Sequence, residues 1–211
     1  MRRFERWRSL LALALVLVAI QQFAGAGIIK AKAWLAPVLI ERAWDHSSAS
    51  GGAPVRPWPW ADTWPVARLQ VPSTDVDLLV LAGDSGNALA FGPGHATASA
   101  RPGEAGTVVI GGHRDTHFAF LRDLAPGAAI RLQSVSGYSR AYRVEEAAIV
   151  DASMHELTAV TAGDRLLLVT CYPFDALRAG GNLRYVVVAS PAEFELHPNL
   201  LYTPQPEVYA L

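Results

Sequence analysis

Three residues of this sequence have side chains suited to chemistry at a carbonyl carbon: Cys171, His113 and Arg184. A thiol must become a thiolate before it is a strong nucleophile. A nearby imidazole can take that proton and later protonate a leaving amine. A guanidinium, which stays charged, can hold the oxyanion of a tetrahedral intermediate. These residue types together suit attack of a thiol on a carbonyl group.

Cys171 is the only cysteine, and it ends an apolar run over Leu166–Val169 that predicts a strand buried on both faces. Pro173 ends the strand, because proline has no amide hydrogen for the ladder. The thiol is therefore expected at the mouth of a strand, beside a loop. A lone cysteine is also commonly a small buried hydrophobe. The presence of His113 and Arg184 favours a functional thiol.

The elements that would position these residues are short strands. Strong apolar patterns predict strands at 67–71, 77–82, 107–112, 129–135, 140–150, 166–170 and 183–189, with helical turns at 87–90 and 118–124 and a turn or loop at 91–95. Seven or eight short strands with little helix predict a mainly β protein, with a closed or nearly closed barrel. His113 and Cys171 then follow strand ends and Arg184 begins a strand, so the three are expected to converge on one edge of that barrel.

The N-terminus predicts a membrane anchor over residues 1–29. Four arginines within residues 2–8 precede Leu10–Ile29, whose only polar members are Gln21 and Gln22. A helix of about 20 residues covers the ~30 Å hydrocarbon core. The arginines favour a cytoplasmic N-terminus and an exported domain. A cleaved signal peptide is the alternative, with residues 24–26 (AGA) resembling a cleavage site.

Residues 30–63 are expected to form a juxtamembrane helix followed by a linker. Apolar side chains occur at roughly helical spacing over 30–44, and Trp34 and Trp44 are of the type found at membrane interfaces. A helix packed on the domain is an equally open interpretation. Proline, glycine and serine crowd the stretch 45–59, which predicts a linker. The catalytic barrel is expected over 64–190, and the tail 191–211 has no interpretable pattern.

Composition excludes several classes of protein. The chain has 211 residues, a net charge of −1 and no basic run beyond its extreme N-terminus, so nucleic-acid binding is not expected. One cysteine excludes a disulfide framework and a cysteine zinc site. His117 lies four residues after His113, but the flanking glycines put the pair at a strand end rather than on a metal-binding helix. No metal and no cofactor are predicted.

Several motifs between residues 67 and 190 resemble those of sortases, which are membrane-anchored cysteine transpeptidases. They are the segments 68–72 (RLQVP), 91–95 (FGPGH), 112–118 (GHRDTHF), 168–175 (LVTCYPFD) and 183–185 (LRY). The most specific combination is Val-Thr-Cys171 with Arg184 13 residues later and Gly-His113 upstream. The anchor and the segments 31–34 and 41–44 further resemble sortases of Gram-negative proteobacteria, which serve few, dedicated substrates.

The resemblance implies an eight-stranded sortase-type barrel and a transpeptidation reaction. Cys171 would attack the Thr–Gly bond of a Leu-Pro-x-Thr-Gly-like (LPxTG-like) sorting signal near the C-terminus of a substrate protein. His113 would protonate the departing amine, and Arg184 would position the peptide or stabilise the oxyanion. An amine acceptor in the cell envelope, or water, would resolve the thioacyl enzyme. The expected location is the inner membrane, as a single-pass protein with a periplasmic catalytic domain.

Thr170 and His95 are secondary candidates for substrate contact, whereas Arg114 and Asp115 are expected to form a structural ion pair.

Two other functions share some of these features. L,D-transpeptidases of the cell wall also use His, Cys and Arg, but their pattern resembles Ser-x-Gly-Cys followed closely by Arg, unlike this sequence. A tethered barrel that binds peptide without cleaving it would not need Cys171, His113 and Arg184 together.

Overall fold

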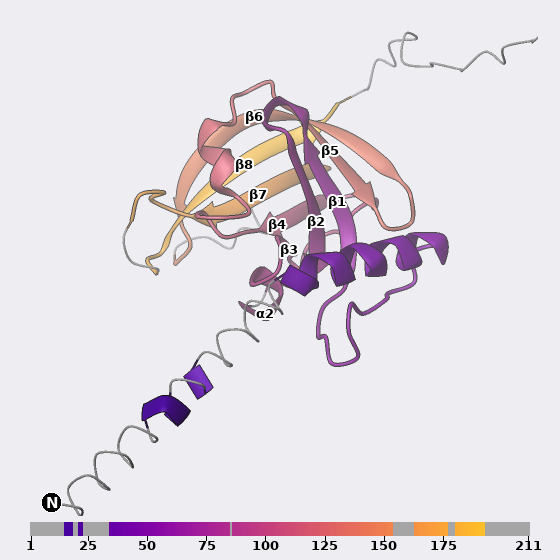
Figure 1. The fold of residues 1–211 in the computed structure, drawn as a ribbon. Helices are drawn as coiled ribbons and strands as arrows, with labels where there is room; N and C mark the ends of the chain where they lie inside the picture. Colours follow the sequence, from indigo (N-terminus) through magenta and orange to yellow (C-terminus); the bar gives the residue numbers. More distant parts are fainter. Residues whose placement is uncertain are drawn as a thin grey trace, which may run out of the picture.

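The chain folds into a closed eight-stranded β-barrel with a few short helices, as seen in a computed structural model (Figure 1). The structure describes residues 15–18, 21–22, 34–84, 86–153, 163–176 and 180–192. The strands are β1 (Pro65–Val71), β2 (Val76–Ala82), β3 (Gly94–His95), β4 (Thr107–Gly111), β5 (Ala129–Ser134), β6 (Ser139–Asp151), β7 (Arg165–Cys171) and β8 (Leu183–Pro191). The short helices are η1 (Pro72–Thr74), α2 (Gly86–Leu89) and η2 (Ala119–Asp123). The prediction of a mainly β, closed barrel is confirmed.

Strands neighbour one another in the order β1-β2-β3-β4-β7-β8-β6-β5, and β5 returns to β1. Most pairs are antiparallel, but β2 with β3 and β4 with β7 are parallel. The β4–β7 pair joins segments far apart in the sequence, with Gly111 beside Val169. Because both strands point the same way, their carboxyl ends reach the same rim of the barrel.

Alternating side chains fill the barrel interior. In β1, residues 65, 67, 69 and 71 are buried and the residues between them are partly exposed, the period-2 pattern of a strand with one face on a core. β7 differs, because Leu166–Thr170 are all buried. Leu166 and Leu168 join the interior core, whereas Leu167 and Val169 belong to a separate apolar cluster. The prediction that this strand is buried on both faces is confirmed.

Two boundaries differ from the sequence-based expectation. The sequence predicts only a turn or loop at residues 91–95, but Gly94 and His95 form β3 between β2 and β4. Two residues are too few to show any strand periodicity, which explains the error. The sequence predicts a linker over residues 45–59, but the helix that the structure describes from residue 34 continues to residue 49.

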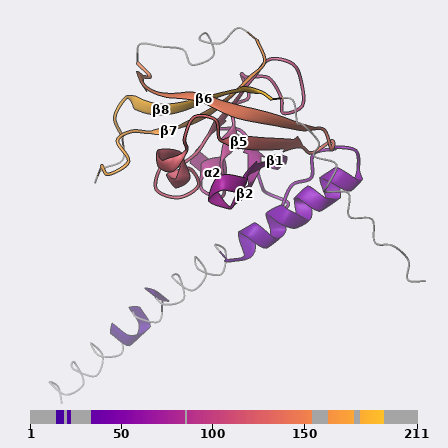
Figure 2. The ribbon, with the colours of Figure 1, turned by 90° about the horizontal axis from the view of Figure 1, so that it is seen from above.

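The helix over residues 34–49 lies against the outside of the barrel, where Figure 2 shows it as a purple coiled ribbon. Ile40 packs with Leu81 and Ala88, and Arg68 of β1 joins Glu41 (2.8 Å) to Asp77 (2.7 Å). Trp44 is buried, so the interpretation as a helix packed on the domain holds at that position. Trp34 is 78% exposed, and its placement at a membrane interface stays a prediction.

None of the helices among the described residues is long and apolar enough to cross a membrane. The predicted anchor over residues 1–29 falls mostly outside the described part of the chain, which includes only 15–18 and 21–22 of it. The tail from residue 193 onward also lies outside the described residues. The anchor therefore stays a prediction.

Gly94 generates a prediction about stability. A Cβ at this position would lie 2.2 Å from the carbonyl oxygen of Gly83, a backbone atom that must move to make room. We expect Gly94→Ala to lower the free energy of unfolding by about 1–3 kcal/mol, the usual cost of overpacking, measured by chemical denaturation. Gly86→Ala is the matched control, because its Cβ would meet nothing within 4 Å and it needs no left-handed backbone. Equal losses in the two variants would contradict the close approach.

Candidate active site

The barrel brings Cys171, His113 and Arg184 to one rim. Cys171 is the last residue of β7, and His113 lies two residues beyond the end of β4, the parallel neighbour of β7. Arg184 is the second residue of β8 and the direct cross-strand partner of Cys171. The predicted convergence of these three positions therefore occurs.

Cys171 and Arg184 lie on the outer face of the barrel. Side chains directly opposite each other in an antiparallel pair share a face, with Cβ atoms about 4.5–5.5 Å apart. The residues that alternate with them, Thr170 and Tyr185, form the next pair, and Tyr185 packs against the interior core. The thiol and the guanidinium stem are therefore held next to each other by strand register alone.

An outer apolar cluster continues from Cys171 along the same face. It consists of Val109, Leu167, Val169 and Val186, with Ala96, Val150 and Val188 partly buried at its margin. Val150 lies opposite Arg184 in the β6–β8 ladder. The surroundings of Cys171 on this face are thus apolar, with the guanidinium at the edge.

The three candidate side chains differ in exposure and in partners. Cys171 is a free thiol and is partly buried, whereas His113 is exposed. Nη1 of Arg184 donates to the carbonyl oxygens of Gly181 (2.8 Å) and Leu183 (3.0 Å). These bonds hold the guanidinium against the loop that leads into β8, beside the strand end that carries Cys171.

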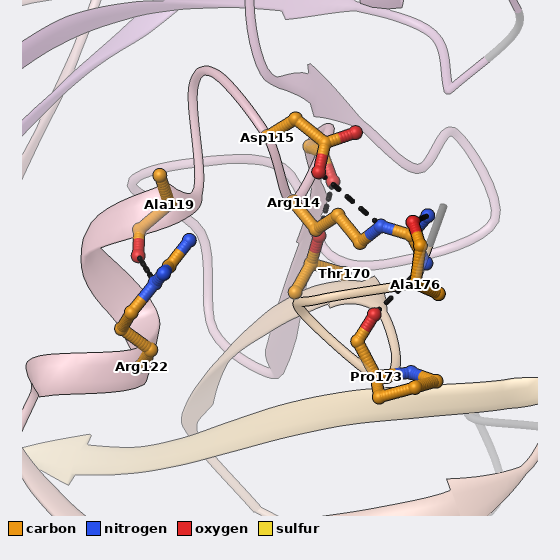
Figure 3. Close-up of polar contacts among 8 residues, drawn as sticks. Arg114, Asp115, Ala119, Arg122, Thr170, Pro173 and Ala176 are labelled. Atoms are coloured by element: carbon orange, nitrogen blue, oxygen red, sulfur yellow. Dashed lines mark hydrogen bonds and ion pairs between the residues drawn. The ribbon is translucent and has the colours of Figure 1, made fainter. Parts of the chain in front are cut away.

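Thr170 connects the two strand ends. Its side chain is 2% exposed and its Oγ1 donates to the carbonyl oxygen of Gly112 at 2.7 Å (Figure 3). The amide of Gly112 in turn donates to the carbonyl oxygen of Val169 at 3.0 Å. Thr170 therefore supports the segment that carries His113, and its contact with a substrate stays a prediction.

The turn that carries His113 is packed tightly on Phe118. The carbonyl oxygen of His113 accepts the amide of Phe118 (3.0 Å), and the Phe118 ring is fully buried. A Cβ on Gly112 would lie 2.7 Å from that ring. Glycine is thus the residue that lets the ring pass beneath the chain immediately before His113.

His117 lies in the same turn, and its ring is partly buried. Burial, together with the nearby His113, holds the pKa of His117 below its ordinary value. Its Nδ1 is buried and makes no hydrogen bond within the described part of the chain. Across the described ranges, no group of three or more His, Cys, Asp and Glu side chains is arranged to hold a metal ion.

His95 makes contacts of a structural kind. It is 5% exposed in β3, and its Nε2 donates to the carbonyl oxygen of Ala100 at 2.9 Å, with Ser99 Oγ 3.2 Å away. Ser99 Oγ also accepts the amide of Val109 (3.0 Å). These bonds shape the turn between β3 and β4, and a substrate contact by His95 stays a prediction.

Arg114 makes more contacts than the predicted ion pair. Its Nε bonds Asp115 Oδ1 at 3.3 Å, which confirms that pair. Sequence reasoning missed that Nη1 and Nη2 donate to the carbonyl oxygens of Pro173 and Ala176, both at 2.9 Å (Figure 3). No sequence signal identifies carbonyl partners, because every residue has one.

An aromatic group around the loop after Cys171 was also missed. Tyr172 stacks on Tyr185, with ring centroids 6.3 Å apart, and Phe174 meets Tyr185 edge-on at 5.2 Å. The guanidinium of Arg122 lies over the Phe174 ring at 5.3 Å. A signal was present in the sequence, since Tyr172 directly follows Cys171 and Tyr185 directly follows Arg184.

Comparisons with known proteins agree with this arrangement. Residues 69–192 match the family model of the sortase domain. Sortase D of Bacillus subtilis (strain 168) is 33% identical over 122 residues, which cover 56% of this chain and 60% of that protein. The match thus spans less than two thirds of that relative.

Among solved structures, the lid mutant of sortase A from Corynebacterium diphtheriae is 27% identical, with a TM-score of 0.56 over 67% of this chain and 77% of that one. Sortase C-1 from Actinomyces oris is 26% identical, with a TM-score of 0.53 over 62% of this chain and 76% of that one. The match over residues 69–192 agrees with the fold and with the rim that gathers Cys171, His113 and Arg184. This chain therefore belongs to the sortase family.

Proposed function

We propose that this protein is a sortase transpeptidase with Cys171 as its nucleophile. The observation that carries the proposal is the rim itself, where Cys171 faces Arg184 across the β7–β8 ladder and His113 follows the parallel β4. Thiol, imidazole and guanidinium thereby meet at the ends of three neighbouring strands, and these groups suit acyl transfer. The family assignment favours this function over an L,D-transpeptidase.

The proposed reaction has two steps. The Cys171 thiolate attacks the threonine carbonyl of an LPxTG-like sorting signal, and the C–N bond to glycine breaks after His113 protonates the amine. The thioester conserves the free energy of the peptide bond, so no nucleotide is needed. An amine, or water, then attacks the thioester and gives up a proton to the His113 imidazole, and the sulfur leaves as thiolate, which restores the starting pair.

Arg184 is assigned to the oxyanion or to positioning the peptide. Its stem lies beside Cys171, and a guanidinium keeps its charge throughout the reaction. Val150, opposite Arg184, and Val188 at the margin of the outer apolar cluster supply apolar contacts suited to the Leu and Pro of the signal. Thr170 supports the site from beneath.

We also propose that the protein acts at the inner membrane, with its barrel on the periplasmic side. The support is the sequence of residues 1–29, with its arginines followed by a long apolar stretch. The substrate is then an exported protein with a C-terminal sorting signal, and the acceptor is an amine of the cell envelope. A dedicated substrate, as in Gram-negative sortases, fits this placement.

The thioacyl enzyme provides a direct test of Cys171. We expect the full-length protein, incubated with a quenched LPxTG-type peptide library, to form an adduct on Cys171 that mass spectrometry detects and that Cys171→Ala abolishes. Adding amine acceptors should discharge the adduct into new amide products. An adduct on another residue would contradict the assignment of Cys171. Binding of the genuine substrate without any acylation would instead favour a peptide-binding barrel.

Substitution of His113 and Arg184 tests the two proposed partners of Cys171. We expect His113→Ala and Arg184→Ala each to lower kcat/KM for the cleaved peptide by about 100-fold or more, corresponding to roughly 3 kcal/mol of lost transition-state stabilisation. His46→Ala and Arg101→Ala are matched controls, because both residues are exposed and Arg101 pairs only loosely with Glu104 (4.0 Å). Near-normal kcat/KM in either test variant, with a native thermal unfolding curve, would remove that residue from the mechanism.

A further inference from the structure

Arg114 is a buried cation at the junction of two loops. Its side chain is only 5% exposed, although arginine is almost never fully buried unless it is paired. Nη1 and Nη2 each donate to one carbonyl oxygen of the loop after β7, and Nε bonds Asp115 (Figure 3). The Asp115 side chain is 68% exposed, so the ion pair reaches the surface while the two carbonyl bonds lie inside.

The two carbonyl bonds need the shape of arginine. The guanidinium is a planar fork whose two terminal nitrogens can serve separate acceptors at once. Here they hold Pro173 and Ala176, which lie three positions apart in the loop after Cys171. A lysine ammonium is a single compact charge on a flexible stem, so it cannot reproduce this double contact.

The positions of these contacts along the chain are specific to the candidate site. Arg114 directly follows His113, and Pro173 comes two residues after Cys171. On the other side, Thr170 directly precedes Cys171 and bonds Gly112, which directly precedes His113. The segments that carry the imidazole and the thiol are therefore tied together both before and after the two reacting residues.

We propose that Arg114 is a positioning residue, which sets the imidazole of His113 against the thiol of Cys171 by clamping the loop after β7 to the turn after β4. It acts through these two residues and does not touch the substrate. This proposal rests on the proposed roles of Cys171 and His113. A misplacement of about 1 Å in a catalytic group can lower the rate about 100-fold, so the clamp matters even at a distance from the peptide.

The test uses the full-length protein with Arg114→Met, which keeps an unbranched apolar stem but removes the charge and the donors, and Arg114→Lys, which keeps the charge but not the fork. Iodoacetamide alkylation of Cys171, followed by mass spectrometry across pH 5–9, reports on the thiol without any substrate. We expect the rate of Cys171 alkylation in both Arg114 variants to depend on pH in the same way as in His113→Ala. We also expect Arg114→Met to add less than a twofold further change in the His113→Ala background.

Peptide turnover provides a second readout. We expect kcat to fall about 10- to 100-fold in both Arg114 variants, with KM changed less than threefold, since the clamp does not bind peptide. Arg143→Met is the matched control. Its Nη1 also donates to a loop carbonyl oxygen, that of Gly127 (2.8 Å). The cross-strand partner of Arg143 is Ser190, which lies at the opposite end of β8 from Arg184. This variant should keep the wild-type alkylation profile and kcat.

The outcomes distinguish the two levels of the proposal. A His113→Ala variant with unchanged alkylation and turnover would overturn the proposed catalytic pair itself. If His113→Ala changes the profile but folded Arg114 variants do not, only the role of Arg114 is overturned. Effects of Arg114→Met and His113→Ala that simply multiply would also overturn it, because Arg114 would then act independently of His113. Unfolding of both Arg114 variants would overturn it as well, because that result assigns Arg114 to stability.

Discussion

The parallel pairing of β4 with β7 is the constraint on which the candidate site depends. Its register sets Gly111 beside Val169, so that the chain leaves both strands at one rim, with His113 on one exit and Cys171 on the other. A slip of one residue would turn every side chain of β7 to the opposite face. Cys171 would then point into the barrel and Thr170 outward. The burial of Leu166 and Leu168 in the core resists that slip.

Buried hydrogen bonds hold together the loops that the strand register places side by side. A polar group removed from water costs free energy unless it is hydrogen-bonded, and a buried charge costs more. The hydroxyl of Thr170 and the guanidinium of Arg114 meet this requirement with backbone carbonyls of the opposing segment. The loops that carry the candidate residues are thus restrained from inside the protein, while the thiol and the imidazole stay on the outer side. Such support suits a site that must hold two groups in a defined geometry.

Much of this arrangement follows from local patterns, but side-chain direction does not. The apolar runs at 107–112, 166–170 and 183–189 predict strands that the barrel contains, because burial on a pleated surface leaves a visible pattern. β3 leaves none, since two residues form no period. Thr170 and His95 are polar residues in suitable motifs, yet both side chains are buried and bond backbone carbonyls. Residue type shows what a group can do, and only its surroundings show what it contacts.

The sequence by itself determined the reactive residue types, the strands that carry them and the resemblance to sortases, because motifs and apolar periodicity are local properties. The tertiary structure alone decided that β4 lies beside β7, that Arg184 faces Cys171 and that Arg114 holds the loop beyond it. These contacts join residues between 13 and 59 positions apart in the sequence. They depend on strand order and register, which arise from burying the whole core at once, and no local stretch of sequence encodes them.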